Sequence, residues 1–148
     1  LVPWRRTDKG KDGVTICAPE KLHSPGIIHT APYPGFPTDA QAPVMAALLR
    51  AGGKTLVADQ IFENRFQHVQ ELQKLGATIF QREFEAIVVG VAELHGAVMR
   101  ARELRGGAAL CIAAAGTCGE SRISQYPFIA RGYENIIRDL QGLGVVIH

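Results

Sequence analysis

Apolar residues follow two different spacings along the chain, and together they predict a domain that mixes strands with helices. Short β-branched runs predict strands at 14–17 and 26–30, ahead of a proline-rich loop at 31–37. From Thr38 onward apolar residues recur every three or four positions, which predicts a helix that the pair Gly52-Gly53 ends. Thr38 or Asp39 is available to cap the start of this helix.

The same alternation continues to the end of the chain. A strand is predicted at 55–58, a helix at 66–75, and a hairpin that pairs 77–80 with 86–89. The remaining predicted elements are a strand at 98–101, a helix at 104–115, a strand at 122–125, a helix at 133–143 and a strand at 145–147. The fold class is therefore α/β (α+β).

Matched landmarks predict an internal repeat. Gly53 pairs with Gly119 and Arg65 with Arg131 at a separation of 66 residues, and 72–76 matches 140–144 at 68. The repeating unit has the order βαβαββ, with one copy at about 26–91 and a partial second copy at about 92–148. A unit of this kind buries only part of its apolar surface alone. We therefore expect the chain to be part of one larger domain that a preceding segment completes.

Composition narrows the class of protein further. The 148 residues are 47% apolar and 20% charged, which excludes a disordered chain. The longest apolar-leaning run, 108–115, is far shorter than the roughly 20 residues of a membrane span, and no signal peptide is visible. Three cysteines without a CxxC pair predict reduced thiols in a cytoplasmic protein, and the five histidines share no spacing that would hold a metal.

The charged residues favour an anionic small molecule over nucleic acid. The net charge is only +2 and the basic residues are scattered, whereas a nucleic-acid binder normally shows a strong or clustered basic excess. Eleven of the sixteen basic residues are arginine, the side chain suited to bidentate anion binding. The alternative explanation of the arginine excess is compositional drift in a GC-rich genome.

Three features could carry chemistry. The stiff loop 33–39 delivers Asp39 to a helix start, either as a general base or as an ordinary N-cap or first-turn acid. Residues 61–66 join a strand to a helix, where small-molecule sites commonly form, although a capped helix with an ion-paired arginine fits too. Arg65, Arg105 and Arg131 stand near helix starts of the repeat and could converge on one polyanion, or form separate surface ion pairs.

Four segments resemble the UDP-N-acetylglucosamine 1-carboxyvinyltransferase family of enolpyruvyl transferases. They are Thr30–Asp39, Ile61–Phe66, Glu103–Leu110 and Arg131–Glu134, and they occur in unbroken order across nearly the whole chain. The resemblance is to the carboxyl-terminal third of that enzyme. It implies an inside-out α/β barrel and transfer of an enolpyruvyl group from phosphoenolpyruvate to the 3-hydroxyl of UDP-N-acetylglucosamine, the step that opens peptidoglycan synthesis.

The resemblance also assigns roles by motif position. Asp39 would be the acid/base group at the sugar hydroxyl. Ile61 and Phe62 would line the nucleotide-sugar with Arg65 nearby. Arg105 and Arg131 would contact phosphoenolpyruvate, and Glu103 and Leu104 would belong to the same substrate-binding motif. No metal or organic cofactor is implied, and the implied partners are the two substrates and the amino-terminal portion of the same enzyme.

Some positions depart from the family pattern. Glu103 stands where the family has Asp, Phe128-Ile129-Ala130 replaces His-Ile-Asp, and Cys118 stands where Glu is usual. The family's reactive-loop cysteine and its Lys-Asn pair belong to the amino-terminal portion, so we expect this chain alone to be inactive. Three alternatives stay open: a 3-phosphoshikimate 1-carboxyvinyltransferase, a non-catalytic homologue that binds a nucleotide-sugar or a protein, and a purely structural fragment.

Overall fold

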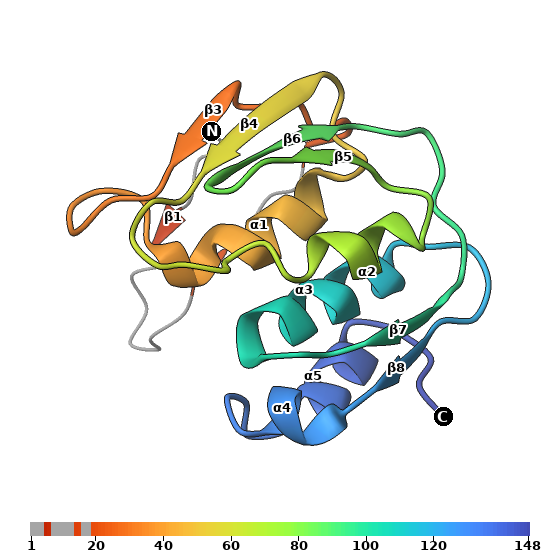
Figure 1. The fold of residues 1–148 in the computed structure, drawn as a ribbon. Coiled ribbons are helices and arrows are strands. Elements are labelled where there is room, and N and C mark those ends of the chain that lie inside the picture. Colours follow the sequence, from red (N-terminus) through yellow and green to blue (C-terminus); the bar gives the residue numbers. More distant parts are fainter. Residues whose placement is uncertain (1–4, 7–13, 16–18) are drawn as a thin grey trace.

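The computed structural model describes residues 5–6, 14–15 and 19–148 and shows a layered α/β arrangement (Figure 1). Two short strands, β1 (Arg5–Arg6) and β2 (Val14–Thr15), pair antiparallel. The first two residues of the strand predicted at 14–17 form β2, and its last two, Ile16 and Cys17, lie outside the described residues.

The first half forms a four-stranded sheet covered by helices on one face. Its elements are β3 (Ile27–His29), the 3₁₀ turn η1 (Thr38–Ala40), α1 (Gln41–Leu48), β4 (Lys54–Ala58), α2 (Val69–Gln73), β5 (Thr78–Gln81) and β6 (Glu85–Val89). The strand order is β3-β4-β6-β5, with β3 and β4 parallel and the other pairs antiparallel. The predicted hairpin is confirmed.

The second half has a two-stranded parallel sheet, which matches the parallel pair β3 and β4 of the first half. Its elements are β7 (Val98–Arg100), α3 (Leu104–Ala115), β8 (Arg122–Ser124), α4 (Tyr126–Ala130) and α5 (Ile136–Gly142), with β7 parallel to β8. In Figure 1 the four-stranded sheet lies over α1 and α2, α3 lies below them, and α4 and α5 follow below α3. Neither sheet closes into a barrel within the part of the chain that the structure describes.

The main core lies between the four-stranded sheet and α1, α2 and α3. Alternate residues of the strands point inward, so Val57 of β4 and Val88 of β6 are buried, and α1 packs against α3. Met45, Leu72 and Leu110 contribute the helical side of the same cluster. This packing fixes the start of α1 and the start of α3 relative to the end of β4, where the candidate site lies.

Two predicted helices have different boundaries in the structure, and one predicted strand does not form. The helix predicted at 66–75 shortens to α2, because residues 61–68 form turns in which Asn64 has φ of +59°. The helix predicted at 133–143 begins only after Asn135, whose side chain caps α5, and α4 precedes it unpredicted. The strand predicted at 145–147 does not form, because the Val145 amide donates to the Leu140 carbonyl and closes the end of α5.

Candidate functional site

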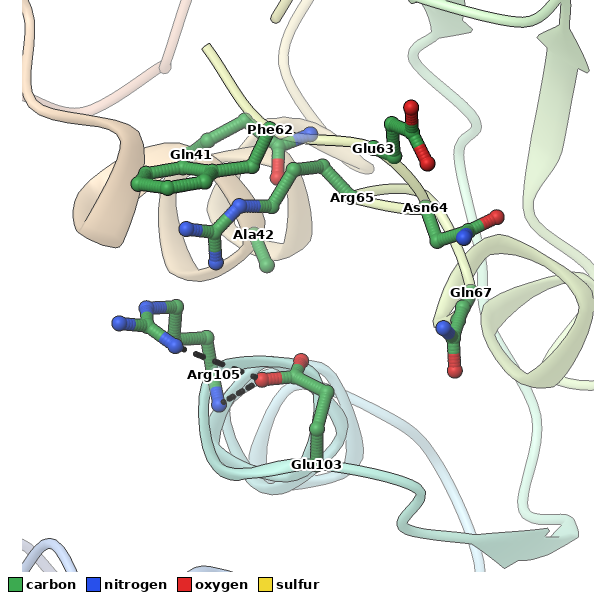
Figure 2. Close-up of a pocket in the computed structure, with 9 residues that line it drawn as sticks. All are labelled: Gln41, Ala42, Phe62, Glu63, Asn64, Arg65, Gln67, Glu103 and Arg105. Atoms are coloured by element: carbon green, nitrogen blue, oxygen red, sulfur yellow. Dashed lines mark hydrogen bonds and ion pairs between the residues drawn. The ribbon is translucent and has the colours of Figure 1, made fainter.

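Three segments that are distant in sequence meet at one cavity. They are the start of α1, the loop after β4 and the start of α3, which the core holds in place (Figure 2). The cavity has a volume of about 310 Å³. Its lining residues are Gln41, Ala42, Phe62, Glu63, Asn64, Arg65, Gln67, Glu103 and Arg105.

Glu103 organises the α3 wall of the cavity. It adopts an extended conformation at the N-cap of α3, and its carboxylate accepts hydrogen bonds from the backbone N–H groups of Arg105, at 2.8 Å, and Gly106. A carboxylate at this position satisfies the free amide groups of the first turn and interacts favourably with the helix dipole. Glu103 is thus a cap that orients the backbone of Arg105, and it also lines the cavity; its role in substrate binding stays a prediction.

Asp39 reaches the same wall through an ion pair. Its Oδ1 accepts a hydrogen bond from Nε of Arg105 at 2.5 Å, and an Arg105 amino group lies 4.0 Å from Glu103. The Asp39 side chain is 68% exposed and that of Arg105 is 35% exposed, so both groups are accessible to a ligand. Neither Thr38 nor Asp39 caps the helix, because Pro37 precedes η1 and neither η1 nor α1 has a side-chain cap. Asp39 does lie in the first turn of η1, as the alternative of an ordinary first-turn acid predicts.

Phe62 and Arg65 form the opposite wall. The Arg65 guanidinium lies 4.5 Å from the centre of the Phe62 ring, a stacked cation–π arrangement. The left-handed conformation of Asn64 bends the chain between them. In Figure 2 Arg65 lies on the upper wall and Arg105 on the lower wall, with both guanidinium groups toward the same end of the space between them, so two of the three predicted arginines share one cavity.

The other predicted residues do not line the cavity; among them, Asp39 lies next to it through its bond to Arg105. Arg131 is exposed at the end of α4, and its guanidinium lies 5.8 Å from the Phe128 ring centre. Leu104 is half-buried beside Gly132, and Ile61 is partly exposed next to Phe62. The structure therefore brings together Asp39, Arg65 and Arg105, and leaves Arg131 outside the group.

Two buried polar residues behind the site were missed by the sequence analysis. The Asp59 carboxylate accepts hydrogen bonds from the Thr38 hydroxyl at 2.6 Å and from the Ile61 backbone N–H at 3.1 Å. His68 is 4% exposed, and its two ring nitrogens have no hydrogen-bond partner among the described residues. Burial lowers its pKa from the ordinary 6.5 to about 4, although the Glu103 carboxylate acts in the opposite direction. Asp59 could have been suspected from its place at the end of a strand, whereas His68 gave no signal.

The site has the donors for an anion and not for a metal ion. Within residues 19–148 and the two short strands before them, no group of His, Cys, Asp or Glu side chains could hold a metal. The two guanidinium groups offer the planar forks that bind phosphate and carboxylate. None of the helices in the described ranges has the length and apolar content that crossing a membrane requires.

Solved structures place this arrangement in a known class of enzyme fold. The enolpyruvyl transferase NikO from Streptomyces tendae matches 99% of this chain with a TM-score of 0.86 and 29% identity, and the match covers 33% of that protein. EPSP synthase from Acinetobacter baumannii, 17% identical, shares the fold with a TM-score of 0.65 over 72% of this chain and 27% of its own. The fold is thus that of an enolpyruvyl transferase.

Sequence comparison then gives the family. The chain belongs to the EPSP synthase (3-phosphoshikimate 1-carboxyvinyltransferase) family, whose sequence model matches residues 5–140. Proteins named UDP-N-acetylglucosamine 1-carboxyvinyltransferase are similar to it: that of Campylobacter jejuni (strain RM1221) is 42% identical over 137 residues, covering 93% of this chain and 32% of that protein. That of Anaeromyxobacter sp. (strain Fw109-5) is 46% identical over 123 residues, 83% of this chain and 29% of its own. The chain spans about a third of the length of these curated relatives.

Proposed function

We propose that this chain contributes one wall of an enzyme that transfers the enolpyruvyl group of phosphoenolpyruvate to the 3-hydroxyl of UDP-N-acetylglucosamine. The observation that carries the proposal is the Asp39–Arg105 ion pair beside a cavity that Arg65 also lines. The relatives at 42% and 46% identity bear the name of that activity, which supports this acceptor over 3-phosphoshikimate. The reaction would belong to peptidoglycan synthesis in the cytoplasm.

Enolpyruvyl transfer needs a general base at the acceptor hydroxyl and cationic groups at the phosphate and carboxylate of phosphoenolpyruvate. In the proposed reaction the acceptor hydroxyl gives its proton to Asp39 as its oxygen bonds to C2 of phosphoenolpyruvate, and C3 takes up a proton. Loss of phosphate from C2 and of a proton from C3 restores the double bond. A positioned general base contributes about 10² to 10⁴-fold to such a step.

The arginines would hold the anionic substrate while charge moves. The guanidinium group of Arg105 is oriented by its hydrogen bond to Asp39. That of Arg65, on the opposite wall, is oriented by its stacking on the Phe62 ring. Fixed cationic donors in a closed cleft stabilise developing charge more than mobile ones in water. Arg131 would join them at the phosphoenolpyruvate side. We assign the second wall of the cleft to the amino-terminal portion of the enzyme.

The test is turnover by the full-length protein that carries this chain. With phosphoenolpyruvate present, we expect phosphate release with UDP-N-acetylglucosamine and not with 3-phosphoshikimate. Asp39→Asn should lower kcat by about 10² to 10⁴-fold with the Kd for the nucleotide-sugar nearly unchanged. Asp139→Asn is the matched control, because Asp139 is exposed on α5 and pairs only with Arg138 among the described residues; its kcat should stay at the wild-type value. Unchanged turnover in Asp39→Asn would remove Asp39 from the mechanism.

A second candidate is a non-catalytic homologue that binds the nucleotide-sugar. It is favoured by Arg131, which stacks on Phe128 and has no carboxylate within ion-pair distance in the described part of the chain. Under this alternative, calorimetry on the full-length protein shows binding of UDP-N-acetylglucosamine, but no phosphate appears. The same titration on this chain alone shows whether one wall is enough for binding.

A further inference from the structure

We propose that Asp59 is a positioning residue that holds both loops of the site, the one that carries Asp39 and the one that carries Phe62. The inference rests on the proposed function in one respect, that Asp39 acts on substrate. Its structural part, that one buried carboxyl group fixes two loops, is independent of which acceptor the enzyme uses.

Asp59 is itself fixed on the sheet. It follows β4 directly, its side chain is fully buried, at 0% exposure, and its backbone N–H donates to the Phe84 carbonyl at 2.8 Å. Phe84 belongs to the turn between β5 and β6, so the backbone at residue 59 is held from the hairpin side. The carboxyl group therefore projects from a rigid point at the edge of the core.

From this point the two carboxyl oxygens reach in different directions. Oδ2 accepts from the Thr38 hydroxyl, 21 residues earlier in the chain, and Oδ1 accepts from the Ile61 backbone N–H. Thr38 is the residue before Asp39, and Ile61 is the residue before Phe62. A buried carboxyl group is costly unless its oxygens are hydrogen-bonded, so these two bonds restrain the loops as well as satisfying Asp59.

The turn that carries Asp39 is bonded to the sheet through Thr38, whereas the bond from Arg105 to the Asp39 carboxylate ties the same turn to α3. Pro37, the cap of η1, offers no side-chain hydrogen bond, and Asp39 itself is mostly exposed. Among the described residues, the Thr38–Asp59 bond is the side-chain hydrogen bond that joins this turn to the sheet. Displacing a reacting group by about 1 Å can cost roughly 10²-fold in rate, so loss of this bond should act on kcat through Asp39.

The experiment compares three variants of the full-length protein. Thr38→Val removes the hydroxyl and keeps the shape, Thr38→Ser keeps the hydroxyl, and Thr30→Val removes a buried hydroxyl that has no partner in the described structure. We expect kcat to fall about 10- to 100-fold in Thr38→Val, with the Kd for UDP-N-acetylglucosamine within about threefold of wild type. Thr38→Ser should restore kcat to within about threefold, and Thr30→Val should match the wild type.

A double variant tests whether Thr38 acts through Asp59. Asp59→Asn keeps the shape of the side chain and weakens the pair, and residues that act as one unit show non-additive effects. The kcat of Thr38→Val/Asp59→Asn should therefore lie within about threefold of the worse single variant. Losses that multiply would show that Thr38 acts independently of Asp59 and would overturn the proposal.

Amide hydrogen exchange separates this inference from the proposed function. Thr38→Val should speed exchange at the hydrogen-bonded amides of Ala40 and Gln41 by about tenfold or more, and Thr30→Val should not, whatever the acceptor substrate proves to be. If exchange changes as expected but Asp39→Asn is fully active, the proposed function fails and the positioning of the loop stands. Unchanged exchange and unchanged kcat in Thr38→Val would overturn the role of Asp59.

Discussion

His68 shows how one side chain behind the site can set the response of the protein to acid. The ring is buried beneath the first turn of α3, where a Cβ on Gly106 would lie 3.0 Å from that of His68. Its pKa of about 4 means that the folded protein keeps the ring neutral well below the pH at which the unfolded chain protonates it. The unfolded state therefore binds more protons than the folded state between these two values, and stability falls as the pH drops from 6.5 toward 4.

We expect the free energy of unfolding to decrease by about 2 kcal/mol on this account between about pH 7 and about pH 5. Urea denaturation at the two pH values measures the loss, and His68→Gln, which does not ionise, should remove most of it. His95→Gln is the control, because His95 is exposed. An equal loss in wild type and His68→Gln would show that other groups cause the acid sensitivity.

At the scale of one element, α3 carries part of the site and also a close contact with α4. A Cβ on Gly107 would lie 2.5 Å from the side chain of Ile129 on α4, so glycine lets α4 approach closely. Gly142, in α5, has nothing within 4 Å of the corresponding position. The two glycines share a helical setting and differ in what surrounds them.

Alanine substitution should therefore act in opposite directions at these two glycines. Alanine is favoured over glycine in a helix by about 1 kcal/mol, which should make Gly142→Ala neutral or slightly stabilising. In Gly107→Ala the clash should outweigh this gain and destabilise the protein by about 1–3 kcal/mol. Thermal denaturation of the two variants checks the pair, and a stable Gly107→Ala would mean that α4 moves away at little cost.

The sequence predicts an element correctly where capping residues, apolar spacing and a stop residue all agree. It fails where tertiary contacts determine the boundaries of the element. The helix at 104–115 has an N-cap, a long apolar run and a glycine stop, and it forms as α3. The predicted helix at 66–75 loses its first turn because the chain there bends around Asn64 to form the cavity. A local bend that serves a site overrides the helical spacing of apolar residues.

The same distinction holds for the site. Asp39, Arg65 and Arg105 stand in recognisable motifs, so the sequence analysis named them; Arg65 and Arg105 line the cavity, and Asp39 joins them by its ion pair with Arg105. Asp59 and His68 act through burial and through partners far along the chain, which no local pattern reveals. Arg131 remains a predicted ligand, since the described wall alone does not bring it to the cavity.

At the scale of the whole molecule, the two proposed repeat units show the same local geometry at matching positions. Gly53 and Gly119, which were paired at 66 residues, both have positive φ, at +102° and +88°. The same separation of 66 links two stacked pairs, Arg65 on Phe62 and Arg131 on Phe128. These parallels support the proposal that 26–91 and 92–148 are copies of one unit. On this view the Phe128–Arg131 pair corresponds to the pair on the cavity wall.

Glu71 joins the two proposed units. Its buried carboxylate, on α2, accepts from the Lys74 ammonium at 2.6 Å and from the Arg100 backbone N–H of β7 at 3.0 Å, and the Arg102 guanidinium lies 3.8 Å away. Burial alone would raise its pKa, but the hydrogen bonds from Lys74 and Arg100 and the nearby charges outweigh it, so the pKa is lowered from the ordinary 4.5. The folded state therefore stabilises the ionised form of the Glu71 carboxyl group.

This junction should be stable at neutral pH and fail in acid. Because the folded pKa lies below the unfolded one, the contribution of Glu71 is complete above pH 4.5 and disappears as the pH falls through the folded value. Glu71→Gln should lower the free energy of unfolding by about 1–3 kcal/mol near pH 7, since buried donors lose a charged acceptor, and should flatten the further loss below pH 4.5. The matched control is Glu134→Gln, which should change the free energy of unfolding little because the Glu134 side chain is 88% exposed.

Urea denaturation at about pH 7 and about pH 4 measures the stability of the two variants, and hydrogen exchange in 98–102 should rise in Glu71→Gln alone. Equal behaviour of the two variants would show that the units are held together by their apolar core without this carboxylate.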